Sequence, residues 1–292
     1  MELELKRGGR TARVETLGGE LVSYRDERGL EYIWGGDPAY WPGRNPLLFP
    51  IVGMLKEGKI RFDGREYAME RHGFARRREF TPAARGEDWV RLELRESAET
   101  LALYPYSFRL AVEQRLTDTG FSTAVTVANP GEGPLPFCLG AHTGFRCPLE
   151  AGERFEDYEL VFPERESCPT LLLRDGLLDR PAALPCLEDT DTLPLDYRWF
   201  DALDTLIFEG LRSRSVTLRS RKSGRGVRVS FDGFPMLAFW TMPGKKAPYL
   251  CIEPWHGCSA GTGEGEEFTD KAHCIVLAPG ESRTLAYRAD TL

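Results

Sequence analysis

The chain has 292 residues, of which 41% are hydrophobic and 28% charged, and a formal net charge of −7. This composition is typical of a soluble globular protein, and the length suits either two domains of ~150 residues or one large β-sandwich. The negative charge, with no basic run denser than Arg76-Arg77-Arg78, argues against a nucleic-acid partner. No apolar segment approaches the ~20 residues that span a bilayer, so no membrane partner is expected.

The first ten residues alternate apolar and charged side chains and lack the apolar core of a signal peptide, which predicts a cytoplasmic protein. The cysteines are odd in number and form no C-x-x-C pair, which argues against a zinc knuckle and a disulfide framework. We expect them to be buried small apolar residues or idle thiols. They are Cys138, Cys147, Cys168, Cys186, Cys251, Cys258 and Cys274.

Short segments with a period of two predict β-strands throughout the chain. In chain order, these segments are 12–15, 108–112, 122–127, 215–219, 227–231 and 284–287. Turn signals bound them, among them Gly18-Gly19, Asp63-Gly64, Ser223-Gly224 and Pro279-Gly280. Many short strands at such spacing are typical of a β-sandwich or barrel. We predict a single all-β domain over residues 1–292.

Helical patterns are scarce, and no ten-residue amphipathic stretch is present. The segment 188–192 is too short and polar to be more than a turn. The proline- and leucine-rich stretch from Arg165 to Asp196 is expected to be a long insertion or loop.

Three of the four histidines, His72, His142 and His256, lie in aromatic-rich segments flanked by glycine or proline. A neighbouring glycine indicates a tight bend or a close approach, and such loops on a rigid β scaffold often carry binding residues. The alternative is that the glycines only end strands and the histidines are surface or core residues. His273 lies near the last strand.

Glu253 follows the apolar run 249–252 and precedes Pro254 and Trp255. A carboxylate at the end of a buried strand should be partly desolvated, which raises its pKa and makes it a better base near neutral pH. The alternative is a carboxylate that accepts backbone N–H groups in a turn. Trp255 is expected to contact a ligand because it lies in this turn, whereas Trp34 and Trp240 are expected to pack in the core.

Other catalytic patterns are absent. The chain has no G-x-S-x-G elbow, no P-loop and no G-x-G-x-x-G after a strand. The segment 261–265 is expected to be an exposed acidic loop. No H-x-H or H-x-x-x-H spacing supports a metal site.

Several motifs, in order, resemble the aldose 1-epimerase (galactose mutarotase) family. They are residues 45–50 (NPLLFP), 56–58 (KEG), 62–64 (FDG), 72–76 (HGFAR), 140–145 (GAHTGF), 248–257 (PYLCIEPWHG) and 277–282 (LAPGES). The glutamate motif is similar to that of the LacX-like branch of the family. Ordered matches extend from about Gly18 to Tyr287, which is nearly the whole chain.

The resemblance implies a large antiparallel β-sandwich, the galactose mutarotase-like supersandwich, with a sugar in a cleft of one sheet. It implies that Glu253 is the general base for the anomeric hydroxyl and that His142 is the general acid for the ring oxygen. His72 would hydrogen-bond the sugar near the reacting carbon, and Asp204 would bind sugar hydroxyls. This acid–base chemistry needs no cofactor or metal.

One position departs from the family pattern. Family members commonly carry a sugar-binding arginine after a Pro-Ile-Val-Gly-like stretch, but here Met54 follows residues 50–53. A thioether cannot donate a hydrogen bond to a hydroxyl. Arg76 is a candidate substitute, and the alternative is a solvated arginine in a basic turn with Arg77 and Arg78.

Three functions therefore remain open. The first is an aldose 1-epimerase that acts on a free hexose. The second is a hexose-6-phosphate 1-epimerase, favoured by the cluster 76–78, which would require two arginines at the cleft. The third is a non-catalytic sugar-binding protein, favoured by Met54 and opposed by the presence of both Glu253 and His142. The expected partner is a small sugar, and the chain is expected to be a monomer or homodimer.

Overall fold

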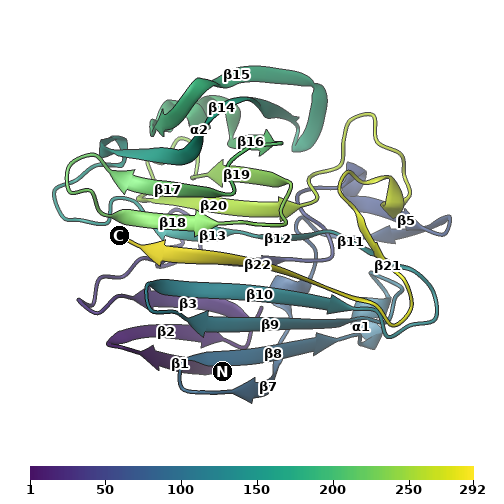
Figure 1. Ribbon diagram of the computed structural model, residues 1–292. Helices are drawn as coiled ribbons and strands as arrows, with labels where there is room; N and C mark the ends of the chain where they lie inside the picture. Colours follow the sequence, from purple (N-terminus) through teal and green to yellow (C-terminus); the bar gives the residue numbers. More distant parts are fainter.

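The computed structural model describes residues 1–292 and consists mainly of antiparallel strands (Figure 1). The large sheet has 15 strands. Its hydrogen-bonded path runs through β4 (Leu47–Leu48), β12 (Leu139–Ala141), β20 (Tyr249–His256), β19 (Met236–Trp240), β16 (Thr205–Glu209), β14 (Tyr158–Arg174), β17 (Ser215–Ser220), β18 (Gly226–Ser230), β22 (Ser282–Thr291), β10 (Gly120–Ala128), β9 (Arg109–Leu116), β8 (Trp89–Arg95) and β7 (Thr81–Arg85). Off this path, β13 (Thr143–Arg146) pairs with β20, and β15 (Leu177–Pro194) pairs with β14.

The remaining elements form smaller units around this sheet. A three-stranded sheet lies beside β9 and contains β1 (Glu2–Arg7), β2 (Arg10–Glu15) and β3 (Glu20–Arg25). Two two-stranded sheets are formed by β5 (Lys59–Phe62) with β6 (Arg65–Ala68), and by β11 (Leu135–Phe137) with β21 (Ile275–Leu277). The helices are α1 (Ala98–Leu101) and α2 (Tyr197–Leu203), and the 3-10 turns are η1 (Lys56–Gly58), η2 (Ala75–Arg77), η3 (Phe155–Asp157) and η4 (Phe268–Asp270). Neither helix has the length and apolar character that crossing a bilayer requires.

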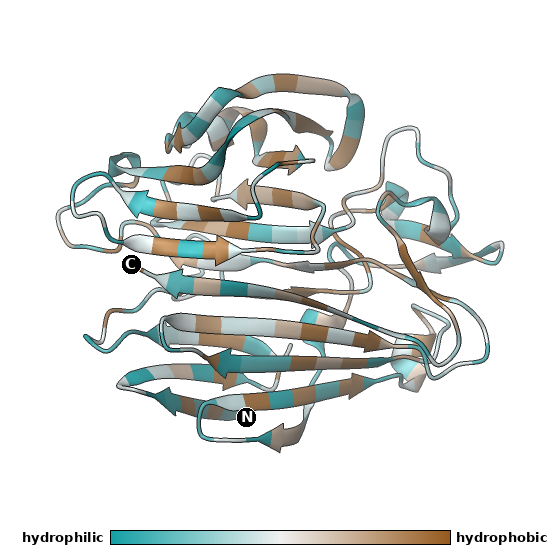
Figure 2. Ribbon diagram, viewed as in Figure 1, coloured by the Kyte–Doolittle hydropathy of each residue, from teal (hydrophilic) through white to brown (hydrophobic).

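The alternating segments of the sequence are strands, as predicted. All six fall mainly within β2, β9, β10, β17, β18 and β22. In β10, buried residues alternate with half-buried ones over nearly the whole strand because successive side chains point to opposite faces. Figure 2 shows the same alternation of apolar and polar residues along the strands. The all-β antiparallel fold class is confirmed.

One buried core links the two halves of the large sheet. Its 72 residues extend along the chain from Leu3 to Ala289. The sheet is continuous across the middle because β22 is hydrogen-bonded to β10 on one side and to β18 on the other. The motifs 140–145 and 248–257 lie in the half that contains β12, β19 and β20.

The expectation of a loop between Arg165 and Asp196 is wrong, because most of this stretch forms the long β14–β15 hairpin, which is seen at the top of Figure 1. The segment 188–192, expected to be a turn, lies inside β15. Four register shifts interrupt the pairing and break the period-two pattern from which the strands would have been recognised. The prolines of β15 are tolerated because, apart from a bridge between Leu178 and Gly261, this strand pairs only with β14.

Candidate functional site

A pocket of about 270 Å³ opens beside the middle of β20. Strands supply its floor, and the loops 41–54 and 71–76 and the tip of the β14–β15 hairpin supply its walls. The lining residues are Trp41, Pro46, Gly53, Arg71, His72, Arg76, His142, Leu173, Gly176, Asp204, Thr205, Trp240, Met242, Glu253, Trp255 and Ser259. All six residues predicted for the site, Arg76, His72, His142, Asp204, Glu253 and Trp255, line this one pocket.

Glu253 lies within a strand and not in a turn. Strand β20 continues through Pro254 to His256, and Glu253 pairs with Ala238 of β19. The expected turn is therefore wrong, and Pro254 is not preceded by a cis peptide bond. The Glu253 side chain is 1% exposed, and its Oε2 accepts a hydrogen bond of 3.3 Å from Nε1 of Trp255. Residues two apart on a strand share a face, which explains why these two side chains meet.

His142 lies between β12 and β13, and both strands pair with β20. Its Nε2 is 3.3 Å from Oε2 of Glu253. The imidazole stacks on Trp41 with ring centroids 4.8 Å apart and meets the edge of Trp240 at 5.6 Å. Its other nitrogen, Nδ1, is buried and has no hydrogen-bond partner. An unpaired buried nitrogen beside a carboxylic acid is costly in a purely structural role, and this favours a ligand-binding role.

Burial shifts the pKa values of Glu253 and His142 in opposite directions. It raises the pKa of Glu253 well above its usual value, and the nearby Asp204 adds to the rise. Burial, with the charges of Arg76 and Arg71, lowers the pKa of His142 to about 3. Both shifts favour the neutral form of each group. Together the shifts favour a protonated Glu253 beside a neutral His142.

His72 presents a hydrogen-bond donor to the pocket. Its Nδ1 accepts a bond of 3.1 Å from the backbone N–H of Gly53, which leaves the proton of the neutral ring on Nε2. Burial and His142 lower the pKa of His72 well below its usual value, so the ring is neutral. The residue has a φ of 65° in the left-handed region. This strained backbone is held by a second bond, from the His72 N–H to the Gly53 carbonyl at 2.9 Å.

Asp204 and Trp240 also line the pocket. Asp204 follows α2 with a φ of 62°, and its Oδ2 accepts a bond of 2.8 Å from the hydroxyl of Thr205. Trp34 packs on Tyr249 with ring centroids 4.8 Å apart, as predicted. The expectation that Trp240 only packs is wrong, because it also lines the pocket. Aromatic faces of this kind suit the apolar faces of sugar rings.

Two arginines reach the pocket, and sequence reasoning missed one of them. Arg76, the candidate substitute for the arginine absent at position 54, lines the pocket and donates a bond of 2.8 Å to the carbonyl of Arg71. Arg71 lines it too, with its Nη2 2.7 Å from the sulfur of Met54. Neither guanidinium is paired with a carboxylate. The signal for Arg71 was its position directly before His72, the first residue of the motif 72–76.

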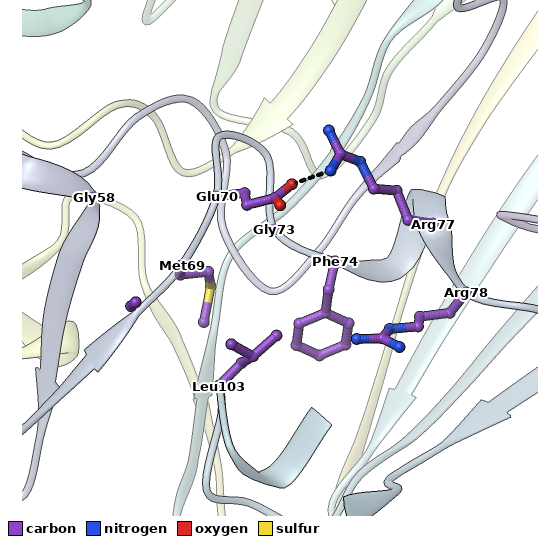
Figure 3. Close-up of a pocket in the computed structure, with 9 residues that line it drawn as sticks. Gly58, Met69, Glu70, Gly73, Phe74, Arg77, Arg78 and Leu103 are labelled. Carbon is purple, nitrogen blue, oxygen red and sulfur yellow. Dashed lines mark ion pairs between the residues drawn. The ribbon is translucent and has the colours of Figure 1, made fainter. Parts of the chain in front are cut away.

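The basic cluster 76–78 does not act as one unit. Arg77 and Arg78 line a separate cavity of about 510 Å³ behind the loop 69–78, together with Met69, Phe74 and Leu103 (Figure 3). Arg77 is paired with Glu70 at 2.5 Å, and Arg78 is paired with Glu99. The prediction that the whole cluster could bind a phosphate is therefore wrong for these two residues. This cavity contains no acid–base pair.

His256 lies outside the pocket, where its Nδ1 is 2.8 Å from the carbonyl oxygen of His273. Within the site, His142, Cys251 and Glu253 place their ligand atoms within 4.8 Å of one another. Zinc binds nitrogen at about 2.0 Å and sulfur at about 2.3 Å, so this set would have to contract around an ion. Any ion held there would occupy both members of the acid–base pair.

The fold and the site define a β-sandwich enzyme with a buried carboxylate–histidine pair in an aromatic pocket. The chain belongs to the aldose 1-epimerase family, whose sequence profile matches residues 1–289. It is thus an isomerase that interconverts the anomers of an aldose.

Comparisons with individual proteins agree with this assignment. The chain is 41% identical to the plasmid-encoded protein LacX of Lactococcus lactis subsp. lactis, over 98% of each chain. A galactose mutarotase related enzyme from Lactobacillus acidophilus superposes with a TM-score of 0.95 at 26% identity, over 100% of this chain and 97% of the other. A galactose mutarotase-like protein from Lactobacillus casei gives a TM-score of 0.93 at 27% identity, over 100% of both chains.

Proposed function

We propose that the protein interconverts the α and β anomers of a hexose, with Glu253 and His142 moving the protons. The observation that carries this proposal is the 3.3 Å contact between Nε2 of His142 and Oε2 of Glu253 within the pocket. Ring opening removes a proton from the anomeric hydroxyl and delivers one to the ring oxygen. One base and one acid at neighbouring positions meet that need without another reagent.

In this proposal, Glu253 and His142 share one proton between Oε2 and Nε2, and the position of that proton sets which group acts as base and which as acid. With the proton on His142, the carboxylate of Glu253 accepts the proton of the anomeric hydroxyl while His142 protonates the ring oxygen. The aldehyde forms, rotation about the C1–C2 bond exposes its other face, and the reverse transfers close the ring and restore the pair. General acid–base help contributes about 10²- to 10⁴-fold per group, or about 3–5 kcal/mol of barrier.

The other pocket residues would hold the sugar. The Nε2–H of His72 is a donor for an oxygen near the reacting carbon, and the carboxylate of Asp204 is an acceptor for sugar hydroxyls. Trp41, Trp240 and Trp255 offer aromatic surface to the C–H face of the ring. These roles are supported by the placement of the side chains in one pocket.

Polarimetry of freshly dissolved α-D-glucose and α-D-galactose tests the proposal. We expect the protein to accelerate the approach to the equilibrium rotation of at least one of them, and His142→Asn to remove most of the acceleration. Binding of sugar without any acceleration would contradict the proposal and favour a non-catalytic sugar-binding protein.

The pH dependence follows from the depressed pKa of His142. A proton added to the pair blocks Glu253 as base, but His142 accepts it only near a pKa of about 3. We therefore expect kcat/KM, corrected for the spontaneous reaction, to stay level from pH 7 down to pH 5. A fall centred on the usual histidine value of 6.5 would contradict the shared-proton model.

A phosphorylated hexose is a second candidate substrate, favoured by the two unpaired arginines, Arg71 and Arg76, in the pocket wall. Charge-assisted bonds of arginine to a phosphate contribute about 1.5–3 kcal/mol. If glucose 6-phosphate is a substrate, Arg71→Gln should raise its KM by about 10- to 100-fold with little change for glucose. Arg77→Gln, outside the pocket, is the matched control. Equal effects of both variants would exclude this phosphate site.

We also propose that residues 1–292 form one domain, which the 72-residue core that extends along nearly the whole chain supports. A cytoplasmic location is supported by the seven cysteines, all of which are free thiols.

A further inference from the structure

Two of the seven cysteines, Cys138 and Cys274, lie opposite each other at the end of the β11–β21 pair. The register of this pair matches Leu135 with Leu277 and Phe137 with Ile275, and Cys138 and Cys274 are the next residues beyond this last matched pair. Directly opposed residues of antiparallel strands have Cα atoms about 4.5–5.5 Å apart. Disulfides need about 4.4–6.8 Å, so a continuation of the pairing by one residue would bring the two cysteines within that range.

The two thiols interact with each other, and the Cys274 thiol also donates to the carbonyl oxygen of Ile275 at 3.6 Å. The interaction with Cys138 and the charge of Lys271 lower the pKa of Cys274, although burial opposes them. The interaction with Cys274 and burial raise the pKa of Cys138. The pair is therefore asymmetric, with Cys274 the more acidic of the two thiols.

Lys271 is a second feature that sets this cluster apart from the other cysteines. Its side chain is fully buried and is paired with Glu264 at 3.4 Å, and the Glu264 side chain is itself 7% exposed. The segment 261–265 was expected to be an exposed acidic loop, but this carboxylate turns inward. A buried ammonium beside two thiols favours thiolate chemistry.

The two cysteines differ in how far they are exposed to solvent. Cys274 is half-buried and lies near the surface, whereas Cys138 is fully buried behind it. An oxidant reaching the cluster meets Cys274 first. A more exposed cysteine that reacts first and a buried one beside it are typical of a reactive thiolate with a neighbouring resolving thiol.

We propose that Cys138 and Cys274 are a peroxide-reactive dithiol pair that closes to a reversible disulfide. The Cys274 thiolate attacks one peroxide oxygen, the O–O bond breaks, and Cys274 becomes a sulfenic acid. The departing hydroxide or alkoxide takes a proton from solvent and leaves as water or an alcohol. The Cys138 sulfur then attacks the Cys274 sulfur, its proton leaves with the hydroxyl as water, and the S–S bond forms. Two thiols are oxidised and one peroxide is reduced.

The pair adjoins the catalytic pocket on two sides. Cys138 directly precedes β12, which leads to His142. On its other side, Cys138 packs so closely on Gly257 that a β-carbon there would lie 2.5 Å from the Cys138 β-carbon. Gly257 follows β20 and precedes Ser259 of the pocket wall. Disulfide closure should therefore disturb the site and lower epimerase activity.

Thiol counting under denaturing conditions after hydrogen peroxide treatment tests the chemistry. We expect the count to fall from seven to five per chain, a loss of two, and dithiothreitol to restore seven. Peptide mapping should identify a Cys138–Cys274 link. In Cys138→Ser, we expect the Cys274 sulfenic acid to persist and to be labelled by dimedone, which should label the wild type much less.

Cys258→Ser is the matched control because Cys258 lies in the same cluster, where burial raises its pKa to about 11. It should still lose two thiols to peroxide, whereas Cys274→Ser should lose none. An unchanged thiol count in the wild type, or a link between other cysteines, would overturn the proposal.

Polarimetry before and after oxidation tests whether the disulfide lowers epimerase activity. This part of the proposal, unlike the disulfide itself, rests on the proposed function. We expect a loss of activity that dithiothreitol reverses and that Cys274→Ser lacks. Full activity of a protein shown by mapping to contain the disulfide would overturn this part of the proposal. The thiol count and peptide map do not depend on the enzyme assay, so the two failures are distinguishable.

Discussion

Glu253→Gln should lower kcat for anomer interconversion by about 10²- to 10⁴-fold. Glutamine has the same shape and can still accept the hydrogen bond from Trp255, but its amide cannot take the proton of the anomeric hydroxyl. The measurement is the catalysed rate by polarimetry at saturating sugar. A variant with the wild-type rate would exclude Glu253 as the base.

The same substitution should leave the free energy of unfolding at pH 7 equal to or above that of the wild type. Because folding raises the pKa of Glu253, the folded protein holds a proton that the unfolded chain releases above about pH 4.5. Stability from this group therefore falls as pH rises from about 4.5 towards the raised pKa. Glutamine, which does not titrate, removes that loss.

Glu166→Gln is the control with the opposite outcome. Glu166 is also 1% exposed, but it lies outside the pocket and accepts the backbone N–H groups of Arg212 and Ser213 at 3.0 and 2.7 Å. Replacing one acceptor oxygen with an amine should lower the free energy of unfolding by about 1–3 kcal/mol and leave kcat unchanged. A matching fall of kcat in both variants would indicate a general defect of folding.

Gly73→Ala should destabilise the protein by about 2–5 kcal/mol and reduce activity. Gly73 has a φ of 67°, and a left-handed conformation costs a residue with a β-carbon about 1–2 kcal/mol. Its β-carbon would also lie 2.3 Å from the carbonyl oxygen of Phe49, and overpacking adds about 1–3 kcal/mol. That oxygen cannot move freely because it accepts the N–H groups of Phe74 and Ala75. The neighbouring His72 should shift with the loop.

Gly58→Ala separates the cost of the left-handed backbone conformation from the cost of the steric clash. Gly58 also has a φ of 67°, but the nearest atom to an added β-carbon is 3.9 Å away. It should therefore cost only about 1–2 kcal/mol, measured by denaturant unfolding, and leave kcat/KM unchanged. An equal loss of stability in both variants would contradict a clash at Phe49.

The local pattern was sufficient for much of the fold. In a strand with one buried face, apolar and polar residues alternate with a period of two, so segments such as 122–127 and 284–287 were recognisable as strands. The β14–β15 hairpin was not, because its register shifts break that period and its prolines are typical of loops. Pairing with β14 overrides this local preference.

Sequence motifs identified six residues of the pocket. The other lining residues are brought to the pocket by contacts between segments that are distant in the sequence. Arg71 and Trp240 were missed because their role depends on how the loop 69–78 and β19 face the pocket. Arg77 and Arg78 were misjudged for the same reason, since neighbours in sequence point to different cavities.

By itself, the sequence determined the all-β class, the family and the residue types of the acid–base pair, because these depend on local periodicity and motifs. Only the tertiary structure decided that Glu253 and His142 lie in contact where burial favours the neutral form of each. That property depends on the 3.3 Å between two atoms from segments more than 100 residues apart and on the burial that holds both groups neutral. Burial is a property of the packed core, and no short segment contains it.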